Sequence, residues 1–225
     1  MISEKVRFEN RQDAGRRLAQ RLLPWKGRPD LVVLGLPRGG VPVAFEIAAA
    51  LGVRLDVWMV RKLGMPGHEE LAMGAIASGG VTVLNEEVIS LLSDARGALA
   101  KAIERESREL ARRESAYRRG RAAPDLTGKT VILADDGLAT GATMRAAVKA
   151  LKKHGVARCV VAVPVGSAEA CANLQNEADE VICLAAPESF RSVGEFYEEF
   201  DQTTDDEVGK LLAAAENWPQ KSDAE

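Results

Sequence analysis

The chain has 225 residues, with 30 lysines and arginines, 33 aspartates and glutamates, and a formal net charge of −3. A chain of this length can bury an apolar core without disulfides, and its slightly acidic balance argues against nucleic acid as a partner. The three cysteines include no Cys-x-x-Cys pair and only two histidines are present, so the composition predicts reduced thiols and no zinc site.

The amino terminus and the apolar runs bear on localisation. Residues 1–10 alternate charged and apolar side chains and lack the apolar core and cleavage site of a signal peptide. No apolar run approaches the roughly 18 residues typical of a membrane span, since Glu46 interrupts even the run over residues 41–51. We therefore expect a cytoplasmic protein with no membrane partner.

Strands and helices alternate at the start of the chain. Asn10 is a predicted N-cap for an amphipathic helix over residues 11–23, where apolar positions repeat every four residues. Residues 31–36 form a continuous apolar run, which is typical of a strand buried on both faces. A glycine turn then leads into a predicted helix over residues 41–51, and residues 55–60 are a second predicted strand.

The next part of the chain departs from this alternation. Residues 61–73 show no clear period and predict a loop, and residues 75–83 predict a hairpin that turns at Gly79-Gly80. Residues 86–119 predict a long helical region with a narrow apolar stripe made of Leu92, Leu99, Ile103, Leu110 and Tyr117. The polar face of this region is predicted to be solvated and to carry weak ion pairs four residues apart, namely Glu104–Arg108, Glu109–Arg113 and Glu114–Arg118.

The alternation resumes in the second half, with predicted strands over residues 130–134, 158–163 and 180–184 and predicted helices over 142–154 and 168–174. With the two earlier strands, this pattern predicts an α/β fold in which helices flank a parallel sheet of about five strands. We expect one domain over residues 1–225. Its parts are a core over about 11–84 and 124–186, a helical insert over about 86–119, an aromatic segment over about 187–200, a helix over about 206–215, and a frayed tail over 216–225.

One segment carries the chemical signal. Residues 131–143 are Val-Ile-Leu-Ala-Asp-Asp-Gly-Leu-Ala-Thr-Gly-Ala-Thr, a buried strand followed by two acids, a turn of small residues and the start of a helix. Small residues let successive backbone N–H groups converge on one anion, and the positive end of the helix dipole adds to their attraction. The hydroxyls of Thr140 and Thr143 add donors, so the turn is suited to a phosphate monoester.

Asp135 and Asp136 stand at the carboxyl end of the predicted strand, where open parallel sheets bind their ligands. Neighbouring carboxylates can accept hydrogen bonds from the vicinal hydroxyls of a ribose, and they can hold magnesium directly or through water. The segment therefore predicts a site for a ribose 5-phosphate compound.

These thirteen contiguous residues resemble the signature of the type I phosphoribosyltransferases, a hydrophobic strand followed by Asp-Asp and a Thr-Gly-x-Thr phosphate loop. Members of that family carry another glycine loop after an earlier strand, and Leu36-Pro37-Arg38-Gly39-Gly40-Val41 has that place here. By analogy we expect a non-proline cis peptide bond between Pro37 and Arg38. The resemblance implies that 5-phosphoribosyl 1-pyrophosphate (PRPP) binds at Pro37, Arg38, Gly39, Gly40, Asp135, Asp136, Gly137, Leu138, Ala139, Thr140, Gly141, Ala142 and Thr143.

The resemblance also implies a reaction. A magnesium-dependent enzyme would transfer the phosphoribosyl group of PRPP to a nitrogenous base and release pyrophosphate, as in purine or pyrimidine salvage. Arg38, Arg61 and Lys62 would meet the pyrophosphate, while Asp135 and Asp136 would hold the ribose and the Mg²⁺. Type I relatives are commonly dimers, so we expect a homodimer.

The general acid or base stays open at this stage. The family has a flexible catalytic loop, and residues 63–73 have its place here. His68, Glu69 and Glu70 are the titratable residues of that segment, and each is either a group for proton transfer or ordinary loop surface.

Base choice in the family depends on a variable hood segment, for which residues 187–200 are the candidate here. Phe190, Phe196 and Tyr197 would either stack on a planar base or pack the hood against the sheet. Ala139 stands where enzymes for 6-oxopurines often carry an acid, which argues against hypoxanthine or guanine as the acceptor. The acceptor itself is not identified by these residues.

Two other functions fit the same pocket. A regulatory relative would sense PRPP or a nucleotide and bind nucleic acid or another protein through a basic surface made of Arg112, Arg113, Arg118, Arg119 and Arg121. The overall acidity argues against it. A hydrolase or phosphotransferase for phosphosugars would use water or another oxygen in place of the nitrogenous acceptor.

Overall fold

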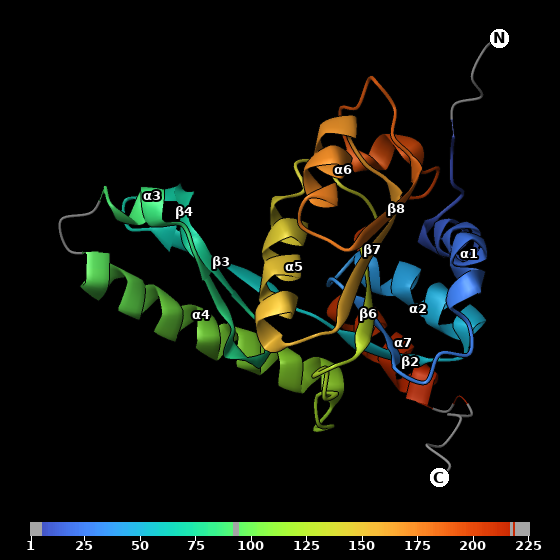
Figure 1. The fold of residues 1–225 in the computed structure, drawn as a ribbon, viewed down its shortest axis with the longest axis horizontal. Coiled ribbons are helices and arrows are strands. Elements are labelled where there is room, and N and C mark those ends of the chain that lie inside the picture. The colour runs from blue at the N-terminus through green and yellow to red at the C-terminus, as the bar shows by residue number, and fades with distance from the viewer. Residues whose placement is uncertain (1–5, 92–94, 217, 219–225) are drawn as a thin grey trace.

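The protein is built around a five-stranded parallel sheet, seen here in a computed structural model that describes residues 6–91, 95–216 and 218 (Figure 1). The strand order is β2-β1-β6-β7-β8, and every neighbouring pair is parallel. The predicted fold class and number of strands are confirmed. The strands are β1 (Leu31–Gly35), β2 (Arg54–Val57), β6 (Thr130–Ala134), β7 (Arg158–Val165) and β8 (Glu180–Ala185).

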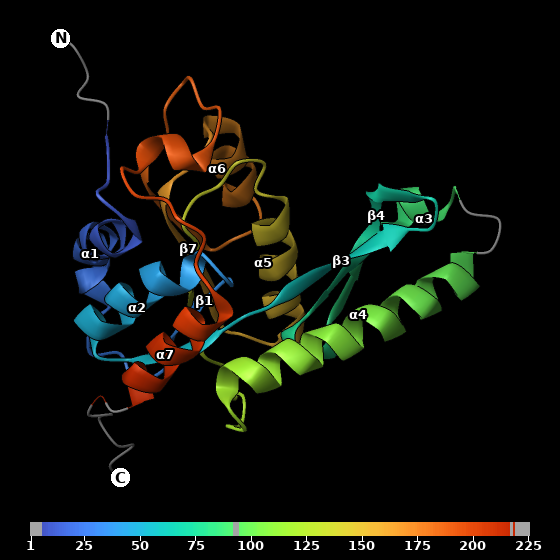
Figure 2. The ribbon, with the colours of Figure 1, turned by 180° about the vertical axis from the view of Figure 1, so that it is seen from behind.

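Helices cover both faces of this sheet (Figures 1 and 2). One face is covered by α1 (Arg11–Leu22), α2 (Gly40–Leu51) and α7 (Asp205–Glu216), and the other by α5 (Ala142–His154) and α6 (Ala168–Gln175). Short 3₁₀ helices lie at Leu23–Trp25, Ser78–Gly80 and Val193–Phe196. Among the described helices, none is long and apolar enough to cross a membrane.

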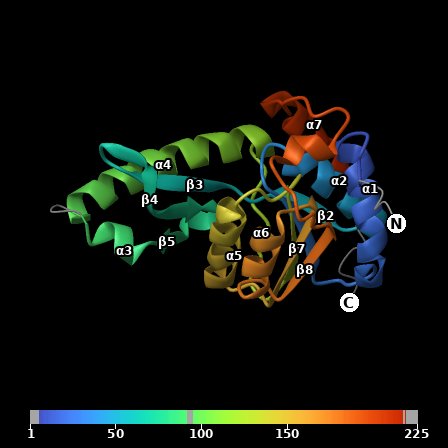
Figure 3. The same ribbon diagram turned by 90° about the horizontal axis from the view of Figure 1, so that it is seen from above.

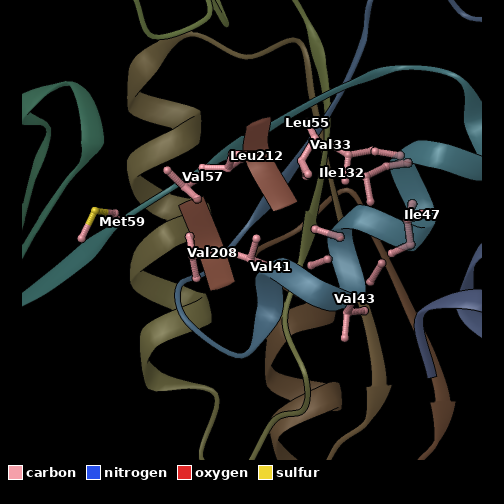
Figure 4. Packing of buried hydrophobic residues seen from close by; sticks show 14 of the residues in the cluster. Val33, Val41, Val43, Ile47, Leu55, Val57, Met59, Ile132, Val208 and Leu212 are labelled. Atoms are coloured by element: carbon pink, nitrogen blue, oxygen red, sulfur yellow. The ribbon is translucent and has the colours of Figure 1, made fainter. Parts of the chain in front are cut away.

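Successive strand residues bury on opposite faces, which explains the unbroken apolar runs. Val33 and Ile132 belong to the core under α2 and α7, whereas Leu34 and Leu133 belong to the core under α5 and α6. Figure 4 shows the first of these cores, where strand residues meet Ile47 of α2 and side chains of α7. Helices thus cover both faces of the sheet, which leaves the ends of its strands for a ligand.

Local signals set the ends of the helices. The side chain of Asn10 accepts a hydrogen bond from the Asp13 amide at 3.0 Å and caps α1 as predicted. Helix α5 has the predicted bounds and ends at Gly155, whose φ of 93° is left-handed and whose amide donates to Leu151 and Lys152. Helix α5 thus begins within the predicted phosphate loop, whose residues Ala142 and Thr143 form its first turn, and it ends at a glycine.

Residues 60–118 form an arm that projects from the sheet (Figures 1 and 3). It contains an antiparallel sheet of β3 (Val60–Met65), β4 (His68–Ala77) and β5 (Thr82–Leu84), together with α3 (Glu86–Ile89) and α4 (Ala95–Arg118). The predicted loop over residues 61–73 was wrong, because β3 and β4 pair there. Register shifts on both sides of Gly64 break the period of two and hide the strand pattern. The predicted turn at Gly79-Gly80 is confirmed, since β4 and β5 pair across it.

The long helical region packs as its stripe predicts, although it is divided into α3 and α4. Leu110 and Tyr117 are buried in the core that also contains Leu63 and Met73 of the arm. Leu92 and most of the tail over 216–225 lie outside the described residues. The apolar stripe of α4 therefore holds the antiparallel strands, and α4 is the spine of the arm.

A buried ionic cluster fixes the arm to the sheet. Arg118 Nε donates to Asp56 Oδ1 at 2.9 Å, and its Nη2 donates to the Val57 carbonyl at 3.2 Å. The same guanidinium lies 3.4 Å from Glu114, which accepts a short hydrogen bond from Ser78. The prediction of a solvated pair at Glu114 and Arg118 was wrong, because this end of α4 turns inward against the end of β2.

Replacing Arg118 with alanine should weaken the fold, because it leaves Asp56 buried without its cation. We expect the free energy of unfolding to fall by about 3–5 kcal/mol, the usual cost of removing one partner of a buried ion pair. Urea denaturation measures the loss. Arg108→Ala is the matched control, since Arg108 lies on the same helix in an exposed pair with Glu104 and should change stability little. Equal losses in the two variants would contradict this account of the arm.

Candidate active site at the carboxyl ends of the strands

Parallel pairing brings two glycine-containing loops together. Strands β1 and β6 are neighbours with Gly35 opposite Ala134, so the segments that follow them leave the same edge of the sheet. We call residues 37–40 the first loop and residues 135–143 the second loop. The Leu36 amide donates to the Ala134 carbonyl at 3.0 Å, which keeps the two backbones adjacent to the point where the loops begin.

The first loop has glycine where it touches the acids. A Cβ atom at position 39 would lie 2.0 Å from Oδ2 of Asp136, and one at position 40 would lie 2.7 Å from the Ala134 carbonyl oxygen. Neither space admits a side chain. The peptide bond between Pro37 and Arg38 is cis, which confirms that prediction. The two glycines thus allow the first loop to pack directly against the second loop. Arg38, which stands between Pro37 and Gly39 in the sequence, is half-buried.

Leu138 anchors the second loop to the end of β7 and to the residues that follow it. Its side chain is buried, its amide donates to the Val165 carbonyl at 2.9 Å, and its carbonyl accepts from the Ser167 amide at 2.9 Å. The Ser167 hydroxyl also donates to the Ala139 carbonyl at 2.9 Å. Because Leu138 points inward, the residues beyond it are turned toward solvent.

The outer part of the second loop has the form of an anion cradle. Thr140, Ala142 and Thr143 are exposed, and Gly141 adopts a left-handed φ of 71° directly before α5. Only glycine takes this conformation readily, and it turns the chain into the first helical residues. The N-terminal amides and dipole of a 13-residue helix thus face the loop opening, an arrangement suited to a phosphate group.

The two acids are the first residues of the second loop and face the first loop. Oδ1 of Asp135 accepts a hydrogen bond from the Asp136 amide at 2.9 Å, and Oδ2 of Asp136 accepts one from Arg11 Nε at 2.8 Å. The Tyr197 hydroxyl donates to the Asp136 backbone carbonyl at 2.6 Å. Asp136 therefore joins the first loop, α1 and the segment after β8.

Arg11 was missed by the sequence analysis. Besides Asp136, it donates to the Asp201 carbonyl at 2.7 Å, and its guanidinium lies 3.9 Å from the centre of the Phe200 ring. Its position after the N-cap of α1 gave no sign of these long-range contacts. Only the pairing of the chain start with residues 196–201 in three dimensions brings Arg11 to the site.

Burial raises the pKa of both aspartates. For Asp135 the charge of Asp136 raises the pKa further, to well above the ordinary value, whereas for Asp136 the hydrogen bond from Arg11 opposes the rise. Ionising both carboxyl groups is therefore unfavourable without a further cation or donor. Ribose hydroxyls or a hard divalent cation would supply that stabilisation.

The structure separates the three predicted cations. Arg38 stays in the first loop, whereas Arg61 pairs with Glu106 of α4, with Nε 2.8 Å from Oε2. Lys62 is exposed and lines a cavity of ≈ 690 Å³ between the arm and α5, which also reaches Thr143 of the second loop. Lys62 thus faces the side of the arm that borders the second loop, and Arg61 faces α4.

His68 lies at the turn between β3 and β4, opposite Met65. This turn is at the end of the hairpin away from its root at Val60, and Figure 3 shows the arm extending away from the sheet. Glu69 and Glu70 follow His68 in β4, but their side chains lie outside the described part of the structure.

The hood aromatics pack on one another. Phe196 and Tyr197 are buried, Phe190 stacks on Phe196 at 5.5 Å, and Tyr197 stacks on Phe200 at 4.8 Å. Phe8, from the start of the chain, completes this small core. The core-packing alternative accounts for these rings, and Phe200, which is 36% exposed, carries Arg11 on its face.

The arginines of the predicted basic surface are engaged within the chain. Arg112 and Arg113 both pair with Glu109, Arg118 is buried in the ionic cluster at the root of the arm, and Arg121 pairs with Glu216. Arg119 has a left-handed φ of 49°, and its guanidinium lies close to Gly209 of α7. Each of these arginines already has a contact within the chain, which does not favour the regulatory alternative.

The chain is similar to known proteins over most of its length. Residues 7–200 match the family described as the phosphoribosyl transferase domain. A Mycobacterium tuberculosis protein, itself provisionally described as a phosphoribosyl transferase, is 50% identical over 209 residues, which are 92% of this chain and 47% of that protein. The chain therefore spans about half the length of the curated relatives it matches so broadly.

Two further similarities complete the comparison. The crystal structure of TT1426 from Thermus thermophilus has 43% identity and a TM-score of 0.82, and it covers 94% of this chain and 99% of its own. A ribose-phosphate pyrophosphokinase from a Marinomonas species is 44% identical over 61 residues, which are 26% of this chain and 19% of that enzyme. The first similarity extends over the arm as well as the sheet, because so little of either chain is left out.

Asp135→Asn should stabilise the protein at neutral pH. The raised pKa means that the folded chain binds more protons than the unfolded chain between the ordinary value of 3.8 and the folded value, so stability falls as pH rises through that window. Asparagine removes this cost, and its advantage over the wild type should vanish as the pH falls toward 3.8. Urea denaturation across this pH range measures the difference.

Asp125→Asn is a control of opposite sign. Its pKa is lowered by the Thr127 amide, so its charge stabilises the fold above the ordinary value and this variant should lose stability at neutral pH. If Asp135→Asn were instead destabilised at neutral pH and unchanged in acid, Asp135 would be a stabilising carboxylate and its assignment here would be wrong.

Proposed function

Because the chain belongs to the phosphoribosyl transferase domain family, we propose that it is a phosphoribosyltransferase that uses PRPP and Mg²⁺ to ribosylate a nitrogenous base and release pyrophosphate. One observation carries the proposal: an acidic pair at the end of β6 lies between a glycine loop and an anion cradle. PRPP has a ribose between a phosphate monoester and a pyrophosphate, so its three parts match these three elements in order.

The cradle would hold the 5-phosphate. Residues 137–143 offer small side chains, the hydroxyls of Thr140 and Thr143, and the start of α5. The first loop would hold the pyrophosphate. Arg38, the residue directly before Gly39 and Gly40, would supply the positive charge. Asp135 and Asp136 would accept hydrogen bonds from the ribose hydroxyls between these two ends.

The residues of the site fit Mg²⁺ bound jointly with PRPP. Asp135 and Asp136 supply the hard oxygen ligands that Mg²⁺ prefers, and Mg²⁺ usually binds with one or two carboxylates plus phosphate oxygens and water. Within the described residues, no cluster of three or more His, Cys, Asp or Glu forms a metal cage, which agrees with such shared binding. The ion would neutralise charge on the leaving pyrophosphate.

In the proposed reaction, the lone pair of an acceptor nitrogen forms a bond to the anomeric carbon while the bond from that carbon to the pyrophosphate oxygen breaks. The sugar gains positive character in the transition state, and the carboxylates of Asp135 and Asp136 would stabilise it. Arg38 would meet negative charge that develops on the leaving group. Arg11 would keep Asp136 ionised and oriented, because its guanidinium already binds Oδ2.

The proposal also includes a pathway, a cellular compartment, a class of acceptor and an oligomeric state. We place the reaction in nucleotide salvage in the cytoplasm, with a purine, pyrimidine or related base as acceptor and a homodimer as the working form. The buried hood aromatics argue against a base stacked on Phe196 or Tyr197. Arg61 and Lys62 remain proposed contacts of the pyrophosphate, and Arg61 would meet it only by leaving Glu106, with which it is now paired.

Calorimetric titration with PRPP and Mg²⁺ tests the binding step. Thr140→Ala should weaken binding about tenfold or more, because a hydrogen bond to a charged group contributes about 1.5–3 kcal/mol. Asp135→Asn should weaken it in the same direction while the fold remains intact. Thr127→Ala is the matched control, since Thr127 is exposed near the opposite end of β6 and should bind as the wild type does.

An acceptor panel then tests the reaction. Pyrophosphate should appear only when PRPP and a suitable nitrogenous base are both present. Equal PRPP breakdown with and without every base would favour the hydrolase alternative, and PRPP binding without any turnover would favour a regulatory role. Equal affinity in the wild type and Thr140→Ala would remove the second loop as the phosphate site.

A further inference from the structure

Two cysteines from different elements meet beneath the second loop. Cys171 lies in α6 and Cys183 lies in β8, and both face the core between the sheet and the helices α5 and α6. Both thiols border the Gly166 peptide: the Cys171 sulfur packs against Gly166, and the Cys183 sulfur and the Gly166 amide approach the same Ala185 carbonyl oxygen. The Cys183 sulfur also lies 3.1 Å from the Ala185 carbonyl oxygen. A helix and the strand that follows it thus place the two sulfur atoms on either side of one glycine.

The pair is in direct contact with the support of the second loop. A Cβ atom at Gly166 would lie 2.7 Å from the Cys171 sulfur, so this sulfur packs against the Gly166 backbone. Gly166 bridges to Leu138, and the next residue, Ser167, binds the Ala139 carbonyl and caps α6. The backbone of Gly166 and Ser167 therefore connects the Cys171 sulfur to the predicted phosphate cradle.

We propose that Cys171 and Cys183 form a modification site at which a hydroperoxide converts the two thiols to a disulfide that links α6 to β8. The site does not depend on the activity proposed above, because it involves neither Asp135 nor Asp136. Its oxidant is a small molecule such as hydrogen peroxide, which suits a thiol pair in which Cys171 is buried and Cys183 is only partly exposed.

The environment distinguishes the roles of the two thiols. The hydrogen bond from Cys183 lowers the pKa of Cys171 to about 7, and the same hydrogen bond, together with burial, raises the pKa of Cys183. A substantial fraction of Cys171 is then thiolate at neutral pH, and the thiolate is the nucleophile in thiol oxidation. Cys171 is the residue attacked first, and Cys183 resolves it.

The reaction balances in two displacements. The Cys171 thiolate attacks one peroxide oxygen, the O–O bond breaks, and hydroxide leaves and takes a proton to become water. The Cys183 sulfur then attacks the Cys171 sulfenic acid, the S–O bond breaks, a second water leaves, and the S–S bond forms. The two thiols lose two electrons and two protons, and the peroxide is reduced to two molecules of water.

Cys159 provides an internal comparison. It is a fully buried residue of β7, and burial raises the pKa of its thiol to about 12. It therefore stays protonated and shielded under conditions that oxidise Cys171. The chain thus contains an inert thiol in β7, the strand next to β8, beside the reactive pair of α6 and β8.

Peptide mapping of the full chain tests the proposal. Reduced protein is treated with hydrogen peroxide, digested and examined by mass spectrometry before and after dithiothreitol. We expect an intramolecular Cys171–Cys183 link that dithiothreitol reverses, and an unmodified Cys159. Cys159→Ser should form the same link at the wild-type rate. Cys183→Ser should form no link and should accumulate a sulfenic acid at Cys171 that a cyclic diketone traps.

Hydrogen exchange follows the effect on the second loop without any ligand. Amides over residues 137–143 should exchange at a changed rate in the oxidised wild type, by about threefold or more, and should not change in peroxide-treated Cys183→Ser. The proposal is overturned if the wild type forms no disulfide, or if the link involves Cys159 or joins two chains. These results do not depend on PRPP, so they are independent of whether the proposed transferase activity is found.

Discussion

The contact between two glycines and two aspartates at the ends of β1 and β6 is the constraint on which the site depends. Parallel pairing of these strands places Gly39 and Gly40 so close to the Asp135-Asp136 segment that no side chain fits between them. The acids are thereby taken out of water, and their pKa values rise. An arrangement that costs stability in the free protein persists because the sheet enforces it, and a ligand with hydroxyls and a cation would relieve the cost.

The elements around this contact restrict it from three sides. Arg11 and Tyr197 hold Asp136 from α1 and the hood, Leu138 holds the second loop from below, and the arm borders the outer side of α5. The buried cluster of Arg118 and Asp56 joins the end of α4 to β2 and so fixes the root of the arm to the sheet. Two charged pairs thus have opposite effects on stability. The Arg118–Asp56 ion pair stabilises the fold, whereas the Asp135–Asp136 pair, which we assign to ligand binding, destabilises it.

Sequence reasoning succeeded where one residue determines a local outcome. Continuous apolar runs identified the five parallel strands, most of which are buried on both faces, and Asn10 marked the start of α1. It failed where the outcome depends on distant partners. The bulged β3–β4 hairpin has no clean period, and nothing near Arg11 or Arg118 indicates that one binds Asp136 and the other is buried with Asp56. The glycines and acids of both loops were found from sequence, but their mutual contact was not.

Co-crystallisation with PRPP and Mg²⁺ is the most direct test of the central claim that the two loops bind one PRPP molecule. The account predicts the 5-phosphate at the amides of residues 139–142, the ribose hydroxyls on Asp135 and Asp136, and the pyrophosphate along Gly39 and Gly40 near Arg38. Density for PRPP in the cavity between the arm and α5, with the second loop still empty at saturating concentration, would contradict it.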